Sequence, residues 1–144
     1  MKKLDNKKFE TKKTIFSELV RQGFIFADKS HKTLFQTEID DDLIKKSSDL
    51  TCALAYLTEA HSLYCDAEVF LKDNIETLDD RPEFTSLIHR FKVYNREVLN
   101  NVRTNHSHQW SDIEFRAFAD SFLDAGILLN IDDVHSLVDS AKED

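Results

Sequence analysis

The apolar positions of the chain recur mainly at helical spacing, and so the sequence predicts helices along most of its length. The clearest stripe lies in residues 82–103, where a large apolar side chain returns every three or four positions. The same period extends through residues 6–22, 42–73 and 111–129, and through a short segment after residue 133. We therefore predict an all-α fold, a helical bundle of five or six helices.

Residues 24–37 depart from this pattern. Aromatic and β-branched side chains stand on both sides of the polar run 28–33, which favours a short β-hairpin there, with a loop over buried aromatics as the alternative. Either structure places His31 at an exposed polar tip. Gly23 fits the position that ends the helix before this segment, and we expect residues 1–5 to be frayed.

Local signals mark where the later helices begin. Pro82 suits the first turn of a helix, and Ser111 with Glu114 has the spacing of a capping box. Residues 42–73 form either one long helix or two helices that meet near residues 47–49.

The chain has 144 residues with two glycines and one proline, which predicts a single helical domain over residues 1–144. Small alanines along residues 42–73 permit close approach of another helix. We expect this helix to pack antiparallel to residues 82–103. The side chains expected at that contact are Leu54, Leu57, Phe91 and Leu99.

Nineteen basic and 27 acidic residues give a formal net charge of -8. This charge argues against binding to duplex DNA or to an anionic membrane, and it suits a protein partner that is basic. No apolar run approaches the length of a transmembrane helix, and the first residues lack the apolar core of a signal peptide. Cys52 and Cys65 are too few for a disulfide scaffold. We therefore expect a cytoplasmic protein with free thiols.

Most catalytic classes lack their signature in this sequence. It contains no glycine-rich phosphate loop, no HExxH, no paired Cys-x-x-Cys and no serine elbow. His61 and Cys65 share a helix face, and His106 and His108 lie close in sequence, but each pair supplies only two metal ligands. We therefore expect neither a metal site nor a small-molecule cofactor.

Polar groups with chemical potential gather between the helices predicted at 82–103 and 111–129. The cluster contains Arg103, His106, His108 and Trp110, and Arg96 lies two turns earlier on the first helix. On one continuous helix, residues five apart point about 140° away from each other, so Arg103 and His108 converge only if the chain breaks between them.

The spacing R-x4-H-x-W of Arg103, His108 and Trp110 at a helix junction resembles the HEPN superfamily of small all-α proteins. The motif of that family is an arginine and a histidine four to six residues apart, often followed two residues later by tyrosine. The resemblance implies metal-independent RNA cleavage by a homodimer, with Arg103 and His108 as the catalytic residues. Such a histidine can transfer the proton of a 2′-hydroxyl, and an arginine can hold the phosphate.

Two functions from different classes follow from these observations. The first is a small acidic protein-binding module that acts as a regulator or inhibitor, with His106, Trp110 and Arg96 as candidate binding residues. The alternative is a HEPN-like ribonuclease, or an inactive relative of one, in a toxin, defence or RNA-processing system. If the junction is only a solvated connector, Arg103 is expected to contact the carbonyls at the end of its helix.

Overall fold

The computed structural model describes the backbone of residues 2–39, 43–78, 81–104 and 109–143, and the side chains of 10–34, 49–78, 81–103 and 111–143. Within these residues the chain forms six helices and no strand: α1 (Lys2–Ile39), α2 (Leu43–Asp73), α3 (Ile75–Leu78), α4 (Pro82–Thr104), α5 (Gln109–Leu128) and α6 (Val134–Lys142). The prediction of an all-α bundle of five or six helices is confirmed. None of the described helices is long and apolar enough to cross a membrane.

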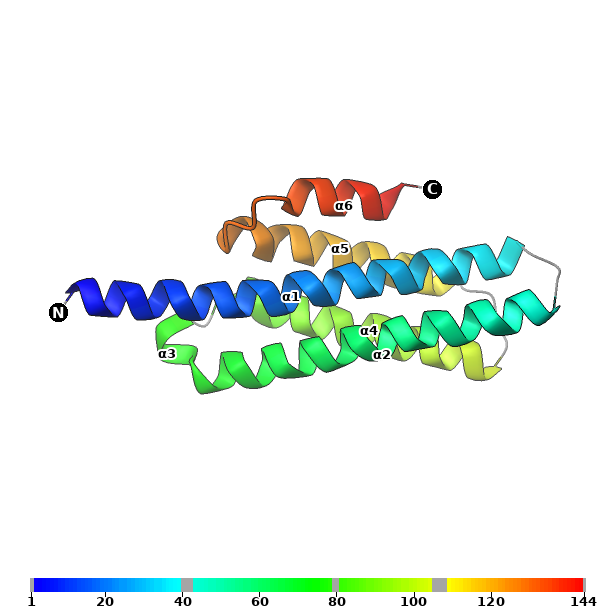
Figure 1. Cartoon of the computed structure of the whole chain (residues 1–144), viewed down its shortest axis with the longest axis horizontal. Coiled ribbons are helices and arrows are strands. Elements are labelled where there is room, and N and C mark those ends of the chain that lie inside the picture. The colour runs from blue at the N-terminus through cyan, green and yellow to red at the C-terminus, as the bar shows by residue number, and fades with distance from the viewer. Residues whose placement is uncertain (1, 40–42, 79–80, 105–108, 144) are drawn as a thin grey trace.

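The long helices run up and down along one axis, as Figure 1 shows. α1 packs most extensively against α2, and α4 packs most extensively against α5, whose other side carries α6. The end of α4 and the start of α5 lie at one end of the bundle, and α3 and the α5–α6 connection lie at the other. Each end of the bundle therefore brings together segments from different parts of the chain.

The core is built around aromatic rings from four helices. Phe24 of α1 stacks on Phe122 of α5 with ring centroids 4.2 Å apart, and Tyr64 of α2 stacks on Phe91 of α4 at 4.5 Å. Phe118 of α5 touches three of these four rings, those of Phe24, Tyr64 and Phe91. Such ring pairs contribute beyond their buried area, which is why phenylalanine dominates the apolar stripes.

The first 39 residues differ most from expectation. α1 continues without interruption from Lys2 to Ile39, so the hairpin or loop predicted at 24–37 is wrong. The helix includes residues 2–5, and the fraying expected for residues 1–5 stays a prediction. A helical period runs through the segment, because Phe24, Ala27 and Leu34 are all buried. Local β-preference of the aromatic residues is overridden by packing of this face against α2 and α5.

Gly23 lies inside α1 instead of ending it, and packing explains the choice of residue. A Cβ atom at this position would come within 2.6 Å of Cε2 of Tyr64. The Tyr64 ring is buried, and its hydroxyl donates a hydrogen bond to the carbonyl of Val20 at 3.0 Å. Gly23 therefore allows α1 and α2 to approach closely, and it is no helix terminator here.

The contact between α2 and α4 is smaller than predicted. Leu57 and Phe91 are buried as expected, whereas Leu54 is partly exposed and Leu99 is 48% exposed. Leu99 follows the buried Val98, and one residue is about 100° of rotation on a helix, which turns Leu99 away from the core. The prediction that Leu99 packs against α2 is therefore wrong.

The other helix boundaries agree with the sequence more closely. α2 is one helix without a break at 47–49, and α4 begins at Pro82. α5 begins at Gln109, so Ser111 lies inside its first turn and does not cap it. The segment predicted as a loop between α2 and α4 contains the short helix α3, whose Leu78 is buried.

Candidate functional sites

The residues predicted to carry chemistry lie where α4 ends and α5 begins. Arg103 is exposed in the last turn of α4, and its Nη2 donates a hydrogen bond to Oδ1 of Asn100 at 3.1 Å. His106 and His108 lie outside the described residues, and the side chain of Trp110 does also. The convergence of Arg103 with His108, and with it the ribonuclease hypothesis, therefore stays a prediction.

Arg96 and Arg103 line one hollow of about 530 Å³ on the outer side of α4. The remaining described residues of its lining are Asn95, Glu97, Leu99 and Asn100. We call these six residues the α4 face. Arg96, Leu99 and Arg103 follow each other at three and four residues, so they share one side of the helix and place an apolar side chain between two guanidinium groups.

A buried hydrogen bond fixes the start of α5 against the end of α4. Nδ2 of Asn101 donates to Oγ of Ser111 at 2.8 Å, and both residues are almost fully buried. A buried amide without a partner would cost on the order of 1–3 kcal/mol, so this pair favours one arrangement of the two helix ends. Asn101 was not among the predicted site residues, although it falls on the buried side of the α4 stripe.

His31 lies near the same end of the bundle. It is buried, so its predicted exposure is wrong. It is only 5% exposed, and its ring stacks on Phe115 with centroids 4.1 Å apart. Nε2 of His31 lies 3.2 Å from Oδ1 of Asp112, whose other oxygen accepts a hydrogen bond from Nε of Arg116 at 3.3 Å. The helical spacing of His31 from Ala27 and Leu34 would have revealed its burial.

Tyr94 lies beside His31 in the core, with ring centroids 6.2 Å apart. Burial raises the pKa of its hydroxyl far above the ordinary value, and the negative charge of Asp28 adds to the effect. Burial also raises the pKa of Asp28, although a hydrogen bond from Lys32 opposes this shift. Tyr94 therefore remains protonated at neutral pH.

A second hollow, of about 570 Å³, lies at the other end of the bundle between α1 and the α5–α6 connection. Its α1 wall consists of Glu10, Lys13, Thr14, Ser17, Glu18 and Arg21, and residues 129–133 form the opposite wall. We call it the α1 hollow. Most of its side chains are polar or charged, and Leu129 and Ile131 are its buried apolar members.

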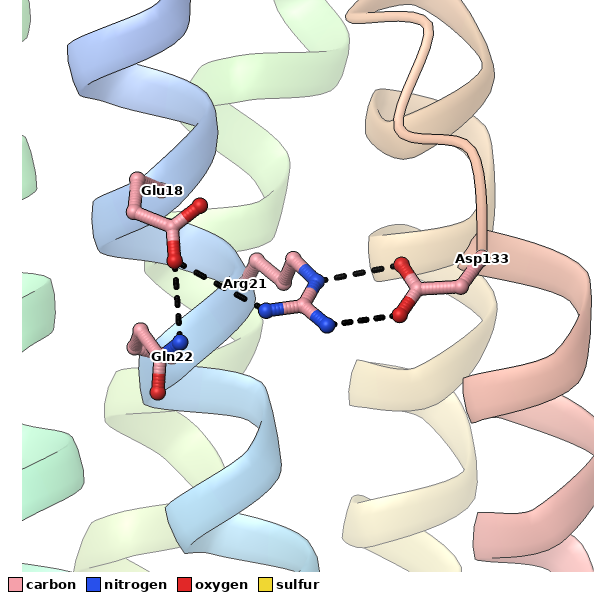
Figure 2. A network of polar contacts seen from close by, with 4 residues as sticks. All are labelled: Glu18, Arg21, Gln22 and Asp133. Carbon is pink, nitrogen blue, oxygen red and sulfur yellow. Dashed lines mark hydrogen bonds and ion pairs between the residues drawn. The ribbon is translucent and has the colours of Figure 1, made fainter.

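Arg21 bridges the two walls of the α1 hollow, as Figure 2 shows. Its Nε and Nη2 donate to the two carboxylate oxygens of Asp133 at 3.0 and 2.6 Å, and its Nη1 lies 3.7 Å from Oε1 of Glu18. The same Glu18 oxygen accepts a hydrogen bond from Nε2 of Gln22 at 2.9 Å. The Arg21 contact lowers the pKa of Asp133, and Asp133 raises the pKa of Arg21.

The backbone of the α5–α6 connection explains how Asp133 reaches α1. Asn130 adopts a positive φ of 56°, which ends α5, and the amide of Ile131 donates back to the carbonyl of Gly126 at 3.0 Å. A Cβ at Gly126 would collide with Val134. The chain therefore turns tightly over the end of α5 and places the Asp133 carboxylate beside Arg21.

The described residues contain no group of three or more His, Cys, Asp or Glu side chains that could hold a metal ion. His61 and Cys65 do meet on α2, where the sulfur lies 3.6 Å from Nε2 and 3.8 Å from Nδ1 of the imidazole. Both residues are exposed, and both Cys52 and Cys65 are free thiols. This pair supplies two of the four ligands that a structural zinc site requires.

No family model matches this chain, and neither a curated protein nor a solved structure matches it.

Proposed function

We propose that this chain is a protein-binding module that holds a basic segment of its partner in the α1 hollow. The observation that carries the proposal is the charge of the hollow, which is lined by four carboxylates and two cations. The formal net charge of -8 over the chain adds a long-range attraction for a basic partner. Such a module acts by covering a basic surface of its partner, as regulators and inhibitors do.

Arg21 is an example of how a basic side chain binds to carboxylates of the α1 hollow. Its guanidinium joins Glu18 of α1 to Asp133 of the opposite wall through charge-assisted hydrogen bonds. Glu10 and Asp132 line the same hollow, are exposed, and have no cation partner among the described side chains. These two carboxylates, one on each wall, are therefore open to an arginine or lysine of the partner.

The size of the hollow is compatible with this role. A volume of about 570 Å³ lies within the range of about 300–1,000 Å³ that is typical of ligand sites. Charge contacts in such an open site weaken as salt rises, because the Debye length shortens to about 10 Å at 0.1 M.

Titration calorimetry with a short peptide rich in arginine and lysine, and with its acidic counterpart, tests the proposal. We expect the basic peptide alone to bind, and to bind less tightly at high salt. Glu10→Gln combined with Asp132→Asn should weaken binding about tenfold or more. The control, Asp66→Asn combined with Asp139→Asn, makes the same charge change at exposed sites on α2 and α6 and should bind normally.

An equal loss in the control pair would show that only net charge matters, and equal binding of the acidic peptide would remove the proposal.

The two free thiols, Cys52 and Cys65, are typical of a reducing compartment, so a cytoplasmic location belongs to the same proposal.

Metal-independent RNA cleavage is a second candidate function, favoured by the position of Arg103. Its guanidinium is exposed, is oriented by Asn100, lines a hollow on α4 and precedes His108 by five residues in the sequence. A homodimer would supply a second such arginine. Incubation of single-stranded RNA with the wild type and with His108→Ala, without divalent metal, tests this function.

A further inference from the structure

The α4 face carries a local charge opposite to that of the whole chain. Arg96 and Arg103 are exposed there, Glu97 is the only acidic member, and the net charge of the chain is -8. Lys92, one turn before Arg96, is already paired with Glu68 at 2.5 Å. The two arginines are therefore the cations that this face offers to a partner.

Leu99 lies between these arginines and is 48% exposed. Burying a leucine is worth on the order of 1.5–3 kcal/mol, so contact with a partner at this position would stabilise a complex. Single exposed leucines are common on protein surfaces. Leu99 differs from such isolated leucines because it lies between two guanidinium groups in a hollow of about 530 Å³.

We propose that the α4 face docks an acidic protein segment that inserts an apolar side chain beside Leu99. Carboxylates of the segment pair with Arg96 and Arg103, because a guanidinium binds a carboxylate through two parallel hydrogen bonds. The spacing of the three residues along α4 suits an amphipathic helix with one apolar stripe and acidic flanks. The occupant is identified by charge complementarity, and it differs from the basic segment proposed for the α1 hollow.

Arg103 donates a hydrogen bond to Oδ1 of Asn100 at 3.1 Å, which orients its side chain before a partner binds. That bond restrains a long side chain whose ordering would otherwise oppose binding. The outer side of α4 is also accessible, since α4 packs mainly against α5 and only weakly against α2. With docking at both ends, the chain would join a basic partner to an acidic one.

Fluorescence anisotropy tests the proposal with a labelled peptide whose leucines are flanked by glutamates. A single-stranded RNA oligonucleotide and a basic peptide serve as competing probes. We expect the acidic peptide to bind, and Leu99→Ser or the pair Arg96→Gln and Arg103→Gln to weaken it about tenfold or more. Glu10→Gln with Asp132→Asn should leave this binding intact, which separates this test from that of the α1 hollow.

Two controls match these changes. Arg81→Gln combined with Arg90→Gln removes the same two charges at exposed positions outside the α4 face, and Ile113→Ser replaces an apolar residue that is 51% exposed on α5. Both should bind the acidic peptide normally. Thermal melting of each variant shows that the fold is retained, since all these side chains are exposed.

Three outcomes would overturn the proposal. Binding of RNA that is insensitive to Leu99→Ser would make the face a nucleic-acid surface. Growth of molecular mass with protein concentration, abolished by Leu99→Ser, would make a second copy of this chain the occupant. Failure of the acidic peptide to bind would leave the face as ordinary solvated surface.

Discussion

The α1 hollow and the α4 face are built in different ways. The α1 hollow joins residues more than a hundred positions apart, and Arg21 and Asp133 hold its walls together by two hydrogen bonds. The six residues of the α4 face all come from one helix. The hydrogen bond between Arg103 and Asn100 joins residues only three positions apart in the sequence. A local motif can therefore be seen in the sequence, whereas a site made by tertiary contact cannot.

The largest expected effect concerns the ribonuclease hypothesis for the α4 end. If it holds, the wild type cleaves single-stranded RNA without divalent metal and leaves 2′,3′-cyclic phosphate ends. His108→Ala should then lower the rate by about 10²- to 10⁴-fold, because proton transfer is lost, and Arg103→Ala should lower it comparably. Gel analysis of a labelled oligonucleotide measures the rate. A wild type that is inert towards RNA would remove this function and leave the α4 face as a binding surface.

The two sides of α4 should respond very differently to truncation. Phe91 is 1% exposed and packs against Tyr64 and Phe118, so Phe91→Ala should lower the free energy of unfolding by about 3–5 kcal/mol. Leu99→Ala on the outer side should change it by less than about 0.5 kcal/mol. Urea denaturation of both variants measures the difference. Similar costs would mean that Leu99 is covered in the free protein.

Gly23→Ala tests the close approach of α1 and α2. Overpacking against Tyr64 typically costs about 1–3 kcal/mol, while the helix preference of alanine returns at most about 1 kcal/mol. We therefore expect a lower melting temperature by calorimetry. A higher melting temperature would show that the Tyr64 ring moves aside at little cost.

Asp133→Asn tests the contact that fixes the walls of the α1 hollow. The two side chains are partly exposed, so the pair should contribute only about 0.2–1 kcal/mol at neutral pH. Arg21 lowers the pKa of Asp133 in the folded state, so this contribution is present above the ordinary pKa of aspartate. It is lost as pH falls through the lowered folded value.

Chemical denaturation of Asp133→Asn and wild type between pH 7 and pH 2 should therefore show a stability difference that disappears at low pH. The control Asp139→Asn, at an exposed position on α6, should show no such difference. A stability difference that persists at low pH would assign the effect to packing instead of charge.

The smallest expected effect is that of metal removal. Two-ligand pairs such as His61 with Cys65 do not hold zinc tightly, so chelator treatment should leave the melting temperature unchanged. A large decrease, with zinc recovered in the dialysate, would show that separate pairs meet in a common site.

The sequence alone determined the helical class and most helix boundaries of this protein. Apolar residues at three- and four-residue spacing define α2, α4 and α5, because helix geometry places such residues on one side whatever they pack against. It also located Arg96 and Arg103, since residues on a single helix keep their spacing in the fold. The predicted partner of Arg103, His108, lies outside the described residues.

Tertiary packing set the helical course of residues 24–37 and the position of Gly23 inside a helix. Local preference favoured a turn there, but burial of Phe24 and Leu34 against other helices favours continuous helix. His31 is buried because its segment is helix and not a turn. Leu99 is exposed because one step along a helix from the buried Val98 rotates the side chain by about 100°. Arg21 and Asp133 carry no local signal of their pairing, since the turn at Asn130 brings them together across 112 positions of sequence.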